Sequence, residues 1–152
     1  MKAVVMRVQE AQVKIEAQEV GAIKQGLLVL LGIAPQDTPE IATHLAQKIC
    51  HLRIFADAEG KMNNSLVQIQ GQILVVSQFT LFADLSSRRP GFTGAARPEK
   101  AQPLYEAFLQ ACTQAGFPPQ HGHFGADMQV TSVNDGPVTL LFDTEAGKAG
   151  GA

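Results

Sequence analysis

The chain has 152 residues, of which 45% are apolar and 17% charged, and its formal net charge is −2. This composition fits one compact globular domain and excludes a disordered or fibrous protein. No apolar run is long enough to span a bilayer, and Arg7 interrupts the apolar start of the chain. The sequence therefore predicts a cytoplasmic protein without a membrane span or signal peptide.

The first third of the chain is predicted to form strands. Residues 1–8 mix Val and Met with charge, as an edge or half-buried strand does, and residues 13–16 alternate between apolar and charged. Gly26 opens the apolar run 27–31, which is short and continuous and so predicts a strand buried on both faces.

A helix is predicted next. Asp37 can cap it, Pro39 lies in its first turn, and Glu40 follows Asp37 at capping-box spacing. The helix should end near Arg53. Its apolar stripe consists of Ile41, Leu45, Ile49 and Leu52. Residues 57–60 then predict a hairpin turn, and residues 73–76 another apolar strand.

A second helix is predicted to end at Gly116. Its apolar stripe consists of Ala101, Leu104, Tyr105, Phe108, Leu109 and Cys112. Pro103 predicts either a helix that begins near it or a kink. Apolar residues within 128–133 and over 138–142 predict two last strands. Residues 1–144 are thus expected to form one domain, and residues 145–152 a flexible tail.

This order of elements predicts an α+β fold with a mixed, largely antiparallel sheet and two main helices. Cys50 and Cys112 lie in the two helices, where a disulfide is one interpretation. We favour two buried thiols in a reducing cytoplasm.

Several kinds of catalytic chemistry have no motif in this sequence. HExxH, CxxC, GxSxG and Gly-rich phosphate loops do not occur. His44 and His51 fit the solvent face of the first helix, and His121 with His123 would give a metal two ligands without an evident third. The sequence therefore predicts neither a metal nor another cofactor.

Two motifs remain. Ser77-Gln78-Phe79-Thr80 follows a buried strand, where hydroxyls, an amide and free backbone N–H groups suit a polar pocket. Asn134-Asp135-Gly136-Pro137 is typical of a tight turn. Composition alone favours ordinary strand termination for the first motif and a plain hairpin turn for the second.

The two motifs together favour a more specific interpretation. From Met1 to about Asp143 the chain resembles the bacterial-type D-aminoacyl-tRNA deacylases. The segments that carry the resemblance are Met6–Val8, Gly26–Gly32, Leu52–Phe55, Gly60–Asn63, Val75–Leu81, Arg89–Pro90, Gly125–Met128 and Val133–Thr139. The resemblance implies a barrel-like core and hydrolysis of the ester of D-aminoacyl-tRNA.

The resemblance also implies an obligate homodimer. In the family, the loop that matches Gly136-Pro137 has a cis peptide bond and enters the partner's active site, where an L side chain would strike it. This is chiral proofreading by exclusion. Glycine has no side chain, so glycyl-tRNA should also be hydrolysed.

The remaining site residues follow from the same resemblance. Ser77–Thr80 match the opposite wall of the pocket, where the Phe79 N–H would act as an oxyanion donor. Thr80 has been interpreted as the nucleophile, whereas we favour water helped by the substrate's 2′-hydroxyl, because no base adjoins Thr80 in sequence. Met128 matches a residue of the adenosine pocket, and Arg7 one that braces the Gly–Pro loop.

The chain departs from the family pattern in two places. The loop 84–92 is about one residue shorter than usual, with Gly91 where Ser is usual, and Pro103 interrupts a helix that is otherwise regular. The loop carries Arg88 and Arg89, which we expect to approach the acceptor end of tRNA.

Two alternatives belong to other classes. One is an editing domain for an L-amino acid, since a related fold serves a threonyl-tRNA synthetase; the intact Gly136-Pro137 argues against it. The other is a non-catalytic nucleic-acid-binding module. The net charge of −2 argues against that module, because such proteins carry a basic surface.

Overall fold

The computed structural model describes residues 1–145, so most of the predicted tail, residues 146–152, lies outside the described residues. The strands are β1 (Lys2–Ile15), β2 (Gln18–Ile23), β3 (Gly26–Gly32), β4 (Phe55–Ala56), β5 (Met62–Asn64), β6 (Gln72–Ser77), β7 (Gln120–His121) and β8 (Gln129–Asp143). The helices are α1 (Pro39–Cys50), α2 (Leu66–Ile69), the 3-10 helix η1 (Phe79–Phe82) and α3 (Pro98–Gln114).

Strand β1 is the centre of the sheet. One edge of it pairs antiparallel with β3 and then, farther along, with β2, while β8 pairs antiparallel along the other edge. The prediction of an edge strand over residues 1–8 is therefore wrong, because both edges of β1 are paired. The two segments predicted over 1–8 and 13–16 belong to one strand. Only long-range pairing on both edges joins them.

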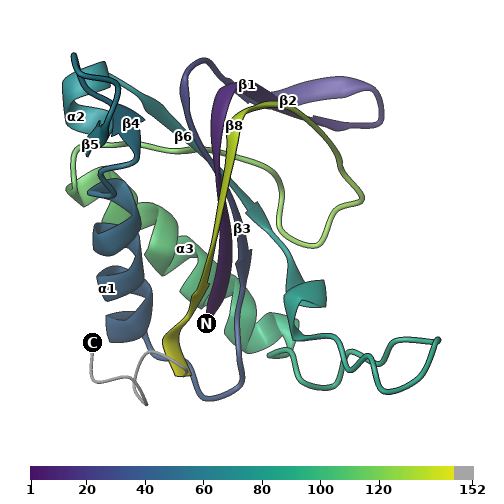
Figure 1. Cartoon of the computed structure of the whole chain (residues 1–152). Coiled ribbons are helices and arrows are strands. Elements are labelled where there is room, and N and C mark those ends of the chain that lie inside the picture. Colours follow the sequence, from purple (N-terminus) through teal and green to yellow (C-terminus); the bar gives the residue numbers. More distant parts are fainter. Residues whose placement is uncertain (146–152) are drawn as a thin grey trace.

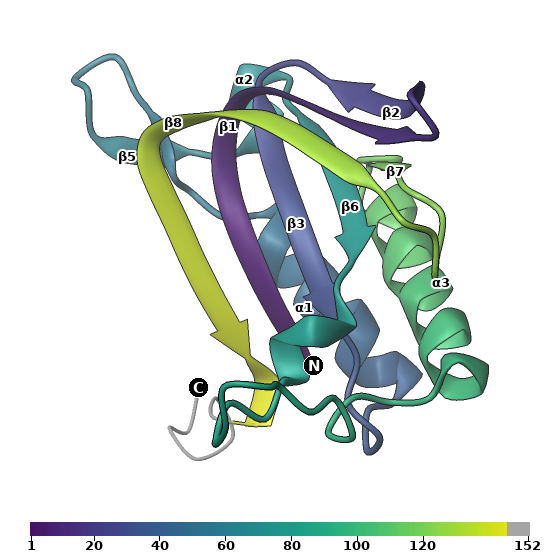
Figure 2. The same ribbon diagram turned by 90° about the vertical axis from the view of Figure 1, so that its right-hand side faces the viewer.

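The other half of the sheet is parallel. β3 pairs with β6, and β6 with β7. Parallel neighbours need a long crossover, which α1 supplies between β3 and β6 and α3 between β6 and β7. β2 also contacts β6 and β7, so the sheet curls into a nearly closed barrel (Figure 2). The predicted mixed, largely antiparallel α+β fold is confirmed.

Each face of the sheet has its own core. Alternation along β3 sends Leu27 and Val29 into a cluster that α1 and α3 cover, and sends Leu28 to the opposite face. Both helices lie on the same side of the sheet (Figure 1). The second cluster lies beneath the β1–β2 hairpin and comprises Val8, Ala11, Val13, Ile23, Leu28, Leu74 and Val76. No helix within residues 1–145 is long and apolar enough to cross a membrane.

The start of α1 differs from the prediction. Thr38 caps the helix, with its side chain accepting from the Ile41 N–H at 3.3 Å, and the helix ends at Cys50. Asp37 is instead buried, because its carboxylate binds the N-terminal ammonium of Met1 at 2.8 Å and the Ala34 N–H at 2.7 Å. The Asp37 side chain does not cap the helix because it binds the Met1 ammonium, 36 residues away in the sequence.

Helix α3 runs through Pro103. The proline removes the donor that would bind the carbonyl of Glu99, and Glu99 is exposed, so water can satisfy that carbonyl. The prediction that the regular helix begins near Pro103 is therefore wrong.

Cys50 of α1 and Cys112 of α3 are free and buried, as the preferred interpretation held. A hydrogen bond between the two thiols lowers the pKa of Cys50 and raises the pKa of Cys112.

The buried hydroxyl of Tyr105 offers a direct test of this core. It donates to the carbonyl of Val75 at 3.2 Å, and burial raises its pKa above the usual range. Because the folded-state pKa is raised, the stability that this group contributes is complete below about pH 10 and falls as the pH rises further. We expect Tyr105 to stay protonated above pH 10 until the protein unfolds.

Absorbance at 295 nm measures this ionisation cleanly, because Tyr105 is the single tyrosine and the chain has no tryptophan. A denatured sample should titrate near pH 10 and serves as the control. A native sample that titrates at the same pH, with its circular dichroism unchanged, would contradict the buried hydroxyl.

Candidate active site

The segment Ser77–Thr80 lies where β6 ends and η1 begins. Ser77 is the last strand residue, and the next residue, Gln78, donates its backbone N–H to the carbonyl of Leu31 at 2.8 Å. Gln78 then precedes η1 with φ −144° and ψ 78°, so the chain turns out of the sheet at this point. The side chain of Phe79 is 57% exposed, whereas Ser77, Gln78 and Thr80 are half-buried.

The turn leaves backbone donors free. Phe79 and Thr80 begin η1, and the first N–H groups of a helix have no acceptor within it. The hydroxyl of Thr80 accepts a hydrogen bond from the side-chain amide of Gln78. An amide cannot take a proton from a nucleophile, and we find no His, Lys or carboxylate bonded to this hydroxyl within residues 1–145. Among residues 1–145, the segment thus offers hydrogen-bond donors, and the Thr80 hydroxyl is bonded to an amide and not to a base.

Gly32 sets the position of this turn. A Cβ at Gly32 would lie 2.9 Å from the Gln78 carbonyl and 3.1 Å from the Phe82 ring. Any side chain at this position would therefore push η1 away from the end of β3. In the sequence Gly32 stands out only as part of a segment that carries the family resemblance, because its contact with Gln78 depends on the fold.

The segment around Gly136 and Pro137 is a bulge in the middle of β8, and the hairpin turn that composition favoured is wrong. Asn134 pairs with Val8 and Thr139 with Met6, so the residues 135–138 face Arg7 alone. Both halves of β8 pair with the same strand, which a hairpin turn would not allow. The Gly136–Pro137 peptide bond is cis, Gly136 has φ +118°, and both residues are exposed.

Arg7 ties this bulge to the rest of the fold. Its Nε donates to the carbonyl of Asp135 at 3.1 Å and lies 3.5 Å from the Asp135 carboxylate. Its Nη1 donates to the carbonyl of Ile54 at 2.7 Å, just before β4. A Cβ on Gly136 would lie 2.8 Å from Nη2 of Arg7, so the guanidinium would have to move, and the φ of +118° itself favours glycine at this position.

A single chain holds the two motifs far apart. Ser77 pairs with Leu31, and Leu31 pairs with Ala3, so Ser77 lies level with Ala3 of β1. The bulge faces Arg7, which lies four residues, or about 13 Å, from Ala3 along β1. β1 and β3 separate β8 from β6, which adds about 14 Å across the sheet (Figure 2). The register therefore places the bulge roughly 20 Å from Ser77 of the same chain.

Met128 packs on the second core cluster. It covers Gly122, where a Cβ would lie 2.4 Å from the Met128 sulfur. Strand alternation puts Ser77 on the other face of β6, with Ile73 and Val75. Met128 and Ser77 thus lie on different faces of β6. Nothing in the sequence around Gly122 predicts this contact with Met128.

Arg88 and Arg89 are exposed in the loop that follows η1, which projects from the body of the molecule (Figure 1). Asp84 and Gly91 close the loop through two backbone hydrogen bonds of 2.7 and 3.0 Å. The N–H of Ser86 binds the Asp84 carboxylate and lowers the pKa of that group. The loop therefore has a defined hairpin-like shape although it is short.

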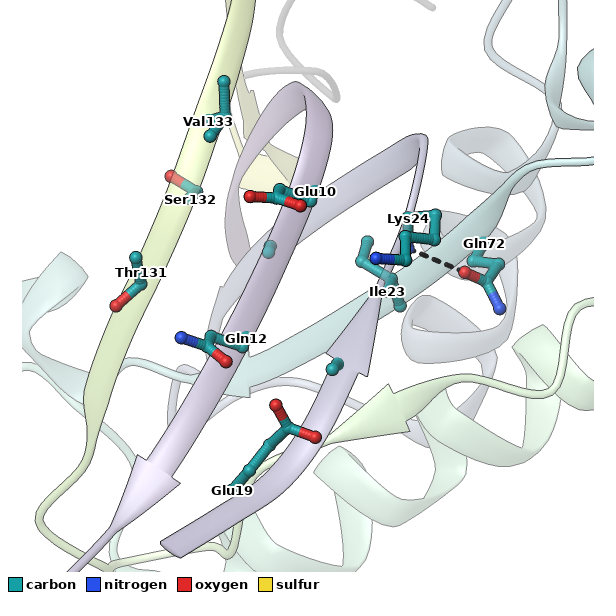
Figure 3. Close-up of a pocket in the computed structure, with 11 residues that line it drawn as sticks. Glu10, Gln12, Glu19, Ile23, Lys24, Gln72, Thr131, Ser132 and Val133 are labelled. Atoms are coloured by element: carbon teal, nitrogen blue, oxygen red, sulfur yellow. Dashed lines mark hydrogen bonds between the residues drawn. The ribbon is translucent and has the colours of Figure 1, made fainter. Parts of the chain in front are cut away.

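A cavity of about 350 Å³ lies elsewhere, over β1 between β2 and β8 (Figure 3). Its polar lining includes Glu10, Glu19, Lys24, Gln72 and Ser132, and none of the predicted site residues belongs to it. Within residues 1–145, no three His, Cys, Asp or Glu side chains gather as they would around a metal.

Comparison with known proteins agrees with the resemblance seen in the sequence. The family model for D-Tyr-tRNA(Tyr) deacylase matches residues 4–143. A solved structure described as "c-Myc DNA Unwinding Element Binding Protein" is 42% identical, with a TM-score of 0.89 over 94% of this chain and 98% of that chain. A probable eukaryotic D-amino acid tRNA deacylase is 18% identical, with a TM-score of 0.81 over 93% of this chain and 98% of that one, and supports the fold. The chain belongs to the D-Tyr-tRNA(Tyr) deacylase family and is a hydrolase of the aminoacyl-tRNA ester bond.

Proposed function

We propose that the chain acts in the cytoplasm as a homodimer and hydrolyses D-aminoacyl-tRNA at sites shared between two subunits. The domain 1–144 supplies Ser77–Thr80 to one site and the bulge at Gly136-Pro137 to its partner's site. The separation of these two motifs within one chain, roughly 20 Å by register, carries the proposal. Neither motif alone encloses a substrate.

The free edge of β8 supports the dimer. In the described part of the chain, β8 pairs with β1 alone, so its other edge is open along the strand. Val130, Val133 and Leu141 on this strand are 40%, 44% and 79% exposed. A long, apolar strand edge is a liability in a monomer, and a second subunit would cover it.

Hydrolysis at this site needs little more than positioning, because an aminoacyl ester is already activated. Water, helped by the 2′-hydroxyl of the terminal ribose, adds to the ester carbonyl carbon. The Phe79 N–H binds the oxyanion that forms. The bond from that carbon to the ribose 3′-oxygen then breaks, and the 3′-oxygen takes the proton that the water loses. Ser77, Gln78 and Thr80 line the wall and hold the turn that presents this N–H.

The partner's bulge provides the chiral selection. Its backbone carbonyls receive the amino group of a D-aminoacyl ester, and an L side chain would strike the bulge. Glycyl-tRNA has no side chain and should be hydrolysed as well. Arg7 holds the bulge through Asp135, and Arg88 and Arg89 approach the acceptor end. Met128 would line the pocket for the terminal adenosine from the face of β6 that carries Val76, opposite Ser77.

Deacylation of D-tyrosyl-tRNA beside L-tyrosyl-tRNA, with and without a chelator, tests the proposal. We expect rapid loss of the D ester alone, unchanged by the chelator. Equal cleavage of both esters would remove the chiral part of the proposal. Turnover of L-seryl-tRNA in preference to both would instead support an editing domain for an L-amino acid.

Replacement of Gly136 by alanine should damage the selecting bulge. The left-handed φ of +118° disfavours any L side chain, and the new Cβ would displace Arg7. Because a misplacement of about 1 Å can cost 100-fold in rate, we expect kcat/KM for D-tyrosyl-tRNA to fall about 100-fold. The ratio of D to L hydrolysis should fall as well.

Gly60→Ala is the matched control. Gly60 also has a left-handed φ, +79°, but nothing lies within 4 Å of its Cβ position, and it belongs to the β4–β5 turn. It should keep the wild-type rate and D-to-L ratio at a temperature where both variants are folded. An unchanged D-to-L ratio in Gly136→Ala would contradict the role of the bulge.

DNA binding is a second candidate, because the 42% identical structure is described as a DNA unwinding element binding protein. The chain's net charge of −2 disfavours it. Salt-sensitive binding of DNA by a protein that turns over neither tyrosyl ester would favour this candidate.

A further inference from the structure

An exposed aromatic pair lies beside the proposed site. The rings of Phe79 and Phe92 meet edge to face, with centroids 5.3 Å apart and planes at 74°. Phe79 is 57% exposed and Phe92 40%, although phenylalanine is normally among the most buried residues. The pair therefore presents apolar π surface to solvent directly next to the N–H that would bind the oxyanion.

The backbone holds Phe92 in this position. Asp84 and Gly91 pair immediately before it. Two residues after it, Gly94 approaches η1 so closely that a Cβ there would lie 3.0 Å from the carbonyl of Phe82. The Ala96 N–H then donates to the carbonyl of Ile33, the residue after β3, at 2.9 Å. The loop is thus fixed on both sides of Phe92, and the aromatic surface is formed before any ligand arrives.

Two cations accompany this surface. Arg88 and Arg89 lie in the same loop, both are exposed, and neither takes part in an ion pair among residues 1–145. Aromatic rings beside arginines are the usual means by which proteins bind single-stranded nucleic acid, since every base has a π face and every linkage a phosphate. If this loop were a subunit contact, the two arginines would lose their hydration, which costs free energy. The edge of β8 is a better subunit contact, because no Lys or Arg adjoins Val133 or Leu141 in the sequence.

We propose that Phe79 and Phe92 form a stacking surface for the unpaired nucleotide that precedes the terminal adenosine of tRNA, with Arg88 and Arg89 on its phosphates. This inference rests on the proposed function, because the terminal adenosine must occupy the pocket beside Phe79. The next base then lies one nucleotide away, within reach of the loop. The surface contributes to binding of the RNA end and leaves the ester chemistry to the pocket.

Two substrates separate this role from catalysis. D-tyrosyl-tRNA carries the preceding nucleotides, and 3′-D-tyrosyladenosine lacks them. Alanine replacement of a stacking aromatic weakens nucleic-acid binding by about fivefold to 100-fold. We expect Phe92→Ala to lower kcat/KM on D-tyrosyl-tRNA by this factor, mostly through KM. The loss on 3′-D-tyrosyladenosine should be at least fivefold smaller, and Phe92→Tyr should restore most of the tRNA activity.

Leu85→Ala is the matched control, because Leu85 is an exposed apolar residue of the same loop, 74% exposed, without a π face. It should keep the wild-type rate on both substrates. Equal losses on both substrates in Phe92→Ala would overturn the proposal, because Phe92 would then only position Phe79 or contact the amino acid. Dissociation of the Phe92→Ala dimer in sedimentation would overturn it too, by assigning the pair to a subunit contact.

The salt dependence of kcat/KM on D-tyrosyl-tRNA reports the phosphate contacts. Each contact to a single strand contributes about 0.7 to the slope of log(kcat/KM) against log salt. Arg88→Ala and Arg89→Ala should each reduce the slope by about this amount, and an unchanged slope in both would contradict the phosphate contacts. Wild-type protein that hydrolyses neither D ester would refute the proposed function itself, a result distinct from these.

Discussion

Phe79→Pro should lower kcat for D-tyrosyl-tRNA by about 100-fold to 1000-fold, the usual cost of losing one oxyanion donor. Proline lacks the backbone N–H, and Phe79 is the first residue of η1, a position where proline is well accepted. Gln78 before it has φ −144°, within the range that a following proline favours, whereas its ψ of 78° lies below that range and must rotate to accept the proline. The substitution therefore removes the proposed donor at the cost of a rotation about ψ of Gln78.

Phe79→Ala separates the donor from the ring. It keeps the N–H and loses the contact with Phe92, so its effect should lie mainly in KM for D-tyrosyl-tRNA. The kcat values of Phe79→Pro and Phe79→Ala are compared on 3′-D-tyrosyladenosine, because this substrate lacks the preceding nucleotide and stacking on it plays no part. If proline and alanine lower kcat equally there, the Phe79 N–H is not an oxyanion donor.

Mixing two damaged subunits tests the shared site directly. A heterodimer of Phe79→Pro and Gly136→Ala has one site with an intact turn facing an intact bulge, and one site with both defects. Random exchange makes half the dimers mixed, so about a quarter of all sites should be active, well above either variant alone. No recovery after exchange, shown by sedimentation, would mean that each site is built from one chain.

The sequence predicted the elements well where local pattern determines them. The apolar run 27–31 became a buried central strand, and residues 57–60 became the turn between β4 and β5. These features depend on residues that are neighbours in the chain. The strand ending at Ser77-Gln78-Phe79-Thr80 was predictable for the same reason.

Features that depend on distant partners were not predictable in this way. Asn134–Pro137 has the composition of a hairpin turn, and only the pairing of both flanks with β1 shows that it is a bulge. Asp37 has the type and spacing of a helix cap, and only the N-terminus folding back against it shows otherwise. Gly32 and Gly122 matter because of what lies against them, Gln78 and Met128, which no local pattern contains.

Asp37→Asn should destabilise the protein by about 3–5 kcal/mol, the usual cost of removing one partner from a buried ion pair. One carboxylate oxygen of Asp37 accepts from the Met1 ammonium at 2.8 Å and the other from the Ala34 N–H at 2.7 Å. Asparagine has one acceptor oxygen, so its NH₂ would face one of these donors, and the ammonium would lose its counter-charge. Thr144, which also accepts from the ammonium at 2.8 Å, cannot supply that charge.

Urea unfolding at neutral pH measures this loss, with Asp57→Asn as the control. Asp57 is half-buried in the β4–β5 turn and accepts two backbone N–H bonds, but its carboxylate binds no buried cation. Since small domains are stable by only about 5–15 kcal/mol, the Asp37 variant should unfold at a much lower urea concentration than the control. Equal midpoints would mean that the Met1 ammonium is not buried against Asp37. The same network joins the ends of β1 and β8 to the β3–α1 connection beside Gly32, so the loss should also loosen the turn that presents Phe79.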